Sequence, residues 1–192
     1  MDYERMIEAF KAESDQEAKD QETMLAYIRG NRSTVLYREN KIAHMTSSGF
    51  IMNPSLDKVL MVYHRIYDSW SWTGGHSDGE RNLLKTALRE AEEETGVETF
   101  QTPMKELLSL AILPVPAHYK GGGYVGVHLH FAPSFLLLAE EDCPLRIKED
   151  ENAGVRWLDA DALARYVTER EMLPVYQWLI GKARALRRSG KI

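Results

Sequence analysis

Several features common in other protein classes are missing from this 192-residue chain. It has no run of about 18 consecutive apolar residues, which argues against a membrane span. Cys143 is the single cysteine, so no internal disulfide can form and we expect a reducing, cytoplasmic setting. Residues 1–21 are acidic and lack an apolar core, so they are not expected to be a secretory signal.

Basic side chains are also fewer than acidic ones, 24 against 29. The formal net charge is -5 at pH 7, which argues against general binding to nucleic acid through its phosphates. A small polyanion remains a possible partner if cations stand between protein and phosphate. Five basic side chains gather near the C-terminus, at Lys182, Arg184, Arg187, Arg188 and Lys191. We interpret them either as a solvated helix end that complements the helix dipole or as a phosphate or partner patch.

The chain is expected to divide into an N-terminal helical extension, residues 1–40, and a single globular domain, residues 41–192. Within the extension, residues 3–12 and 16–29 carry apolar side chains at helical spacing. Asp15 is placed to cap the second helix. The extension and the basic C-terminus could supply the interface of a homodimer.

Strands and helices alternate through the rest of the chain. Two apolar runs flank a turn at residues 53–57, which indicates a β-hairpin. Further strands are predicted at 106–115, 124–138 and 153–158, a short helix at 159–167, and a last helix that opens at Pro174 and buries Trp178. A bulge, an edge or a break is expected at Pro133, which lacks an amide hydrogen. This order indicates an α/β fold, a mixed sheet with helices on both faces.

The strongest helix signal covers residues 80–95, where apolar side chains recur at helical spacing and Gly96 marks the end. This helix would place Glu90, Glu93 and Glu94 on one face, because residues three and four apart are neighbours. Glutamates on one face are often simply solvated. They also offer the oxygen ligands that Mg²⁺ prefers. A turn at residues 74–75, both glycine, would let a backbone carbonyl approach a metal or phosphate.

These residues resemble the motif of the Nudix hydrolase family. That motif reads glycine, five residues, Glu, seven residues, Arg-Glu, an apolar residue, any residue, Glu-Glu, any residue, Gly and an apolar residue. The chain matches every position but one, at Gly75, Arg89, Glu90, Ala91, Glu93, Glu94, Gly96 and Val97. The exception is Arg81, which replaces the family's first glutamate, a structural partner of the motif arginine. How Arg89 is held is therefore open.

The likeness covers residues 44–165, and the opening GGHSDG is similar to that of a bacterial subgroup with a GGHxDG start. It implies a Nudix-like α/β/α sandwich with a mixed β-sheet, extended by the N-terminal helices and a C-terminal helix. In the family, Glu90, Glu93 and Glu94 would bind Mg²⁺ or Mn²⁺ with help from a carbonyl of Gly74 or Gly75.

The resemblance also assigns catalytic roles. Glu93 and Glu94 would act in catalysis, and Arg89 would orient the glutamates. An acid of the later loop often supplies a further ligand or the general base. Glu151 is the first choice for that role and Glu149 the second, against the reading of a plain polar loop.

Histidines and tryptophans are the remaining candidates for substrate binding. His128 and His130 share a strand face, and His76 and His118 could lie near it. They are either half-buried strand residues or hydrogen-bonding partners of a phosphate or base, and the lack of a thiolate partner argues against zinc. Trp72 would stack on a base or pack in the core.

The sequence thus predicts a Mg²⁺-dependent hydrolase that cleaves the pyrophosphate bond of a nucleoside diphosphate linked to another moiety. ADP-ribose, a dinucleoside polyphosphate or a modified nucleotide would fit, and no nucleic acid or membrane partner is expected. One alternative is a non-catalytic nucleotide-sensing module, which Arg81 favours. Another is an enzyme like isopentenyl-diphosphate isomerase, which the absence of a cysteine beside the glycines disfavours.

Overall fold

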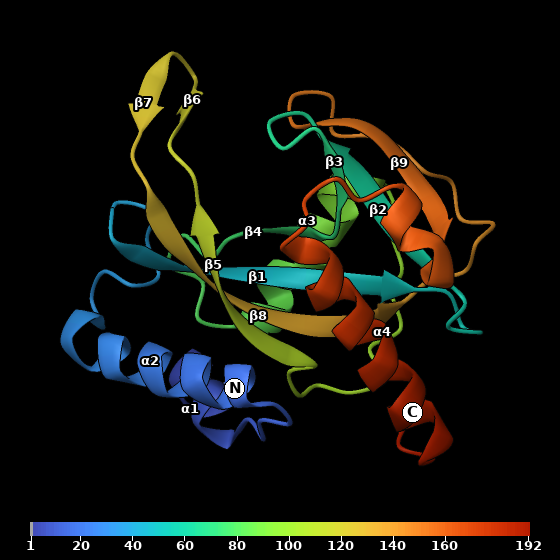
Figure 1. Ribbon diagram of the computed structural model, residues 1–192, viewed down its shortest axis with the longest axis horizontal. Coiled ribbons are helices and arrows are strands. Elements are labelled where there is room, and N and C mark those ends of the chain that lie inside the picture. The colour runs from blue at the N-terminus through green and yellow to red at the C-terminus, as the bar shows by residue number, and fades with distance from the viewer. Residues whose placement is uncertain (1) are drawn as a thin grey trace.

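A seven-stranded mixed β-sheet forms the centre of the protein, and helices cover both of its faces (Figure 1). This computed structural model describes residues 2–192. The sheet contains β1 (Ala43–Met52), β2 (Lys58–His64), β3 (Ser69–Ser71), β4 (Thr73–His76), β5 (Ser109–Val115), β8 (His128–Leu138) and β9 (Asn152–Asp159). The hairpin of β6 (His118–Lys120) and β7 (Gly123–Val125) projects from one end. The helices are α1 (Tyr3–Ala9), α2 (Asp15–Asn31), α3 (Leu83–Thr95), the 3₁₀ helix η1 (Ala160–Arg165) and α4 (Met172–Arg188).

Strand β1 organises the sheet because it pairs with three other strands. Its middle pairs antiparallel with β4, where Thr46 lies opposite His76, and its last two residues pair antiparallel with β2. Along its other edge it pairs in parallel with β8, where His44 lies opposite His130. The start of β1 therefore lies between β4 and the start of β8, and these three strands build one end of the candidate site.

Successive residues of the central strands enter two different cores, as the pleat of a strand requires. Phe50 enters the core beneath α4, and Ile51 enters the core beneath α3. Strand β8 repeats the pattern, with Leu136 on the α4 side and Phe135 on the α3 side. The α/β/α sandwich and mixed sheet predicted from the sequence are confirmed.

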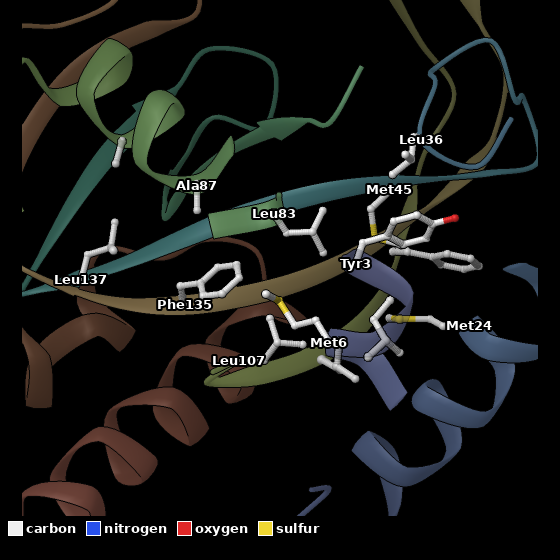
Figure 2. Packing of buried hydrophobic residues seen from close by; sticks show 14 of the residues in the cluster. Tyr3, Met6, Met24, Leu36, Met45, Leu83, Ala87, Leu107, Phe135 and Leu137 are labelled. Carbon is white, nitrogen blue, oxygen red and sulfur yellow. The ribbon is translucent and has the colours of Figure 1, made fainter. Parts of the chain in front are cut away.

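The N-terminal helices share the core of α3 instead of standing apart (Figure 2). Tyr3 and Met6 of α1 and Met24 of α2 are buried in the same cluster as Leu83 and Phe135. Burial of each such side chain stabilises the fold by about 1.5–3 kcal/mol. The extension therefore contributes to the stability of the sheet that carries the site.

A buried ion pair ties α2 to α4 and β5. The Glu17 carboxylate is fully buried and accepts hydrogen bonds from Ser109 (2.6 Å), Trp178 (3.1 Å) and Lys182 (3.0 Å). Burial alone would raise the pKa of Glu17, but these hydrogen bonds lower it. Lys182 is thus a structural residue, and of the basic side chains near the C-terminus Arg184 also pairs internally, with Asp161 at 2.7 Å.

Several predicted boundaries were wrong. The helix predicted from residue 80 begins at Leu83, because the side chain of Asn82 accepts a hydrogen bond from the Lys85 amide and caps it. Ser14, and not Asp15, caps α2. The last helix begins at Met172, so Pro174 lies inside its first turn. Its Trp178 was predicted to be buried and is 36% exposed, although its indole nitrogen donates a hydrogen bond to the buried Glu17.

The other differences concern backbone geometry. The single strand predicted over 124–138 is interrupted between β7 and β8, where Val127 is exposed. The predicted break at Pro133 occurs on one side only. Pairing of β8 with β1 stops at Phe131 and resumes at Ser134, while pairing with β5 is continuous. The strand predicted from 106 begins at Ser109, and the helix predicted over 159–167 is the 3₁₀ helix η1.

Within residues 2–192, no helix combines the length and apolar character that crossing a membrane requires.

Candidate active site

Helix α3 presents its glutamates to strand β4 because its apolar side chains are committed to the core. Leu83, Ala87 and Ala91 are fully buried in the cluster beneath the sheet. Glu90 and Glu94, one turn apart, then lie side by side along the neighbouring helix face. Both are buried, at 7% and 4% exposure, whereas the Glu93 side chain is 41% exposed. The three predicted metal ligands therefore form a site with a buried floor and an exposed rim.

Two glycines make the close approach of β4 to α3 possible. A Cβ added at Gly75 would lie 2.4 Å from the Glu90 carboxyl carbon, so only glycine leaves that carboxylate in place. The Gly74 amide donates a hydrogen bond of 3.3 Å to Glu94 Oε2. The glycines were predicted to form a turn, which was wrong. They lie within β4, where Gly74 and Gly75 pair with Ser48 and Ser47 of β1.

Burial makes negative charge costly on this helix face. It raises the pKa of Glu90, which Arg89 partly offsets, and it raises the pKa of Glu94 well above its ordinary value, with Glu90 adding repulsion. Carboxylates in such a place need a cation or a proton. Their oxygen donors and crowding fit a hard divalent ion such as Mg²⁺.

Arg89 is held by the glutamates of its own motif. Its guanidinium lies 2.8 Å from Glu90 and 3.4 Å from Glu93, and it donates a hydrogen bond of 3.4 Å to the His76 carbonyl. Arg81, which replaces the family's first glutamate, points elsewhere. It donates a hydrogen bond of 2.7 Å to Asp2 and stacks over the Tyr3 ring. The departure from the motif therefore serves the N-terminal extension and removes no metal ligand.

Lys148 joins the loop before β9 to the end of α3. Its ammonium lies 3.2 Å from Glu93 and 3.0 Å from Glu151, so these two carboxylates, 58 residues apart in sequence, approach one positive charge. Burial opposes this charge, but hydrogen bonds to Glu151 and Glu93 raise the pKa of Lys148. Glu151 thus lies at the site, and Glu149 is exposed. Lys148 was not predicted from the sequence. Its position three residues before Glu151 could have indicated this ion pair.

Histidines gather at the adjoining end of β4. His76, His128 and His130 lie together as predicted, with His128 Nε2 3.3 Å from His130 Nε2 and the His76 and His130 rings 5.1 Å apart. His118 is farther away, its ring 6.5 Å from that of His128. The sequence missed His44, whose ring lies 5.0 Å from those of His76, His128 and His130.

Burial, with repulsion from the neighbouring imidazoles, lowers the pKa of His130 to about 2. Burial also lowers the pKa of His44, although its hydrogen bond to the Asn40 carbonyl acts in the opposite direction. His44 and His130 therefore offer neutral ring nitrogens at this end of the site.

One cleft of about 1330 Å³ contains both groups of side chains. We call the part lined by the glutamates of α3 the carboxylate end and the part lined by the histidines the histidine end. The glutamates of α3, Glu151 and the histidines line it, and so does Trp72. The Trp72 ring also packs edge-on against Tyr176 at 5.7 Å, so it is both a core residue and a wall of the cleft. Trp70, in contrast, packs on Tyr63 and Arg156. Gly121 and Gly122 adopt positive φ at the tip of the β6–β7 hairpin, which fits a turn.

Comparison with known proteins agrees with this geometry. The family model described as NUDIX domain matches residues 43–179. A C. elegans Ap4A hydrolase is 14% identical with a TM-score of 0.51, over 76% of this chain and 98% of that one. An E. coli dihydroneopterin triphosphate pyrophosphohydrolase is 18% identical with a TM-score of 0.52, over 71% of this chain and 95% of that one. No curated protein matches the chain. At these identities the structures show a shared fold, and the match to the family model, which spans most of the chain, establishes that it belongs to the Nudix family of pyrophosphohydrolases.

Proposed function

We propose that this protein is a Mg²⁺-dependent hydrolase of the pyrophosphate bond in a nucleoside diphosphate linked to another moiety. The observation that carries the proposal is the pair of buried carboxylates, Glu90 and Glu94, beside glycines that leave no room for a side chain. A fold has no structural need for two adjacent buried acids whose pKa values are raised. A divalent ion bound there would offset their charge and bind the phosphate oxygens of the substrate.

Metal binding, proton abstraction and orientation of the carboxylates are assigned to different residues of the site. Glu90, Glu93 and Glu94 would hold Mg²⁺ or Mn²⁺, with the Gly75 carbonyl as a further oxygen. Such an ion supplies charge neutralisation and a more acidic bound water. Glu151 is the candidate general base, because it comes from a different element and reaches the same ammonium as Glu93. Arg89, paired with Glu90 and Glu93, orients these carboxylates.

The cleft suits a substrate larger than one nucleotide. Its volume of about 1330 Å³ exceeds the range of about 300–1,000 Å³ typical of pockets for small ligands. Trp72 offers an aromatic surface for a base, and His76, His128 and His130 offer hydrogen bonds. The two proteins of similar fold, an Ap4A hydrolase and a dihydroneopterin triphosphate pyrophosphohydrolase, support this substrate class.

The test is a hydrolysis assay with substrates whose phosphates are esterified at both ends. ADP-ribose and diadenosine tetraphosphate carry no terminal phosphate, so alkaline phosphatase releases inorganic phosphate only after the pyrophosphate bond has been cleaved. We expect Mg²⁺-dependent release with at least one of them, loss of that release in Glu93→Gln and Glu94→Gln, and retention in Glu92→Gln. Glu92 is the matched control because it lies on the same helix and is exposed.

A second outcome would favour the sensing module. If nucleotides raised the melting temperature while none of a broad set of diphosphates was hydrolysed, binding without chemistry would be the function. The structure gives this alternative less support than the sequence did, because Arg81 is occupied with Asp2 and Tyr3.

A further inference from the structure

Three strands bring three histidines to one point of the cleft. His44 of β1 lies opposite His130 of β8 in the parallel ladder, and β4, on the other edge of β1, ends at His76. One nitrogen from each of these rings lies within 4.8 Å of the other two. The rigid ladder therefore positions the rings, and no flexible loop is needed to assemble them.

The environment of His44 fixes which nitrogen faces the cluster. Its Nδ1 lies 2.9 Å from the Asn40 carbonyl, which can only accept, so Nδ1 carries the hydrogen and Nε2 has a lone pair. Within residues 2–192, this buried Nε2 has no hydrogen-bond partner, and His44 is 3% exposed. A buried acceptor without a partner destabilises the fold, and a bound ligand would remove that cost.

A backbone carbonyl that orients an imidazole is also the usual support of a metal-binding histidine. His128, next to the cluster, makes the same kind of contact, with its Nδ1 2.8 Å from the Gly126 carbonyl. Its Nε2 then faces His130 Nε2 at 3.3 Å. At that distance His130 Nε2 can donate a hydrogen bond to the His128 lone pair, so His128 holds the His130 ring beside the cluster.

We propose that His44, His76 and His130 form a second metal site, which binds a transition-metal ion, Zn²⁺ foremost, through three imidazole nitrogens. Imidazole ligands suit Zn²⁺, whereas Mg²⁺ prefers oxygen, so the two ends of the cleft select different ions. Three protein ligands leave one position open toward the cleft for water or a substrate oxygen. The absence of a thiolate disfavoured zinc when His44 was not counted among the ligands, but three imidazoles are enough to bind it. This proposal does not depend on the hydrolysis proposed above.

The test measures metal binding by the full chain after removal of metals with EDTA. Co²⁺, which has a visible spectrum when tetrahedrally bound, serves as the probe, and Zn²⁺ is used in competition. Millimolar Mg²⁺ is present throughout to occupy the carboxylates. We expect one equivalent of Co²⁺ to bind, to give a tetrahedral spectrum and to be displaced by Zn²⁺.

Two variants remove one ligand each. His44→Gln and His76→Gln should weaken Co²⁺ binding at least about 100-fold, since even loss of an outer-shell partner weakens metal binding by about 10–100-fold. His64→Gln, outside the cluster, should bind as the wild type does. His76 is half-buried, so its variant decides the matter if His44→Gln fails to fold by circular dichroism.

Two results would overturn the proposal. One is wild-type protein that binds no Co²⁺ in the presence of Mg²⁺, and the other is Co²⁺ binding that His76→Gln leaves unchanged. Glu93→Gln separates this inference from the proposed function, because it should abolish hydrolysis and retain the Co²⁺ spectrum.

Discussion

The two ends of the cleft show how one physical effect prepares two kinds of ligand. Burial disfavours charge at both ends, so it raises the pKa values of Glu90 and Glu94 and lowers those of His44 and His130. For a carboxylate, burial creates a need for a cation. For an imidazole, it produces the neutral form that binds metals. The carboxylate end offers hard oxygen donors, and the histidine end offers softer nitrogen donors. Strand β4 connects the two ends, since His76 follows Gly75 directly.

The sharpest way to separate the two ends is Gly75→Ala. The new methyl group would displace the Glu90 carboxylate, which lies 2.4 Å from its position, while the histidine rings keep their strand register. We expect Mg²⁺-dependent hydrolysis to fall by about 100-fold, the size of effect seen when the support of a metal ligand is lost.

Gly181→Ala is the control for that substitution, because the space around it in α4 is open. Its activity should equal that of the wild type, and circular dichroism should show both variants folded. Full activity in Gly75→Ala would show that the close approach of β4 to Glu90 has no functional role.

A smaller effect is expected from Lys148→Gln, which changes charge at the carboxylate end alone. Lys148 lies on Glu93 and Glu151 and so competes with a divalent ion. Its removal should tighten Mg²⁺ binding by about 3- to 10-fold, the range of one partly exposed charge interaction. A titration of activity against Mg²⁺ measures this change. Weaker Mg²⁺ binding in the variant would contradict the competition.

Glu169 tests whether burial raises a carboxyl pKa in this cleft. It belongs to neither end, and burial, with some repulsion from Glu171, raises its pKa to about 7. Its folded pKa lies above its ordinary value of 4.5, so its destabilising effect appears as pH rises through this interval and is complete above pH 7.

Glu169→Gln should therefore melt higher than the wild type at pH 8 and at nearly the same temperature at pH 4. Allowing for solvent screening, we expect a difference of about 2–4 °C at pH 8, which corresponds to about 1 kcal/mol in a chain of this length. Differential scanning calorimetry at the two pH values measures it. An equal difference at both would show that the ionisation of Glu169 is not responsible.

The smallest effect should come from Arg81→Ala, far from the donor atoms of either end. The pair of Arg81 and Asp2 is partly exposed, so its loss should cost less than about 1 kcal/mol and leave catalysis unchanged. Lys19→Ala, which breaks the exposed pair with Glu22, is the comparison in urea unfolding. A large loss of activity in Arg81→Ala would mean that this residue has a role in the motif.

The carboxylate end could be predicted from the sequence because its geometry is local. Glu90, Glu93 and Glu94 lie on one helix, and helical spacing alone places them together. Glu151 was found through the family pattern. Arg81 was recognised as a departure, but its partner Asp2 is 79 residues away and only the packing of α1 reveals it.

The histidine end could be predicted only in part because it depends on register. The alternation of His128 and His130 is visible in the sequence, whereas the place of His44 opposite His130 follows from a parallel pairing that no local pattern specifies. The start of α3 was predicted three residues too early, at residue 80. Its true start at Leu83 depends on the hydrogen bond from the Lys85 amide to the Asn82 side chain.

The most direct test of the account is Mg²⁺-dependent cleavage of ADP-ribose and diadenosine tetraphosphate by the wild type, Glu94→Gln and Glu92→Gln. Glutamine keeps the shape of Glu94 and removes its charge, so we expect activity to fall at least about 100-fold, as for other groups that act on transition-state charge. The Glu92 variant should retain full activity. Equal activity in all three proteins would contradict the claim that the buried carboxylates of α3 form the catalytic metal site.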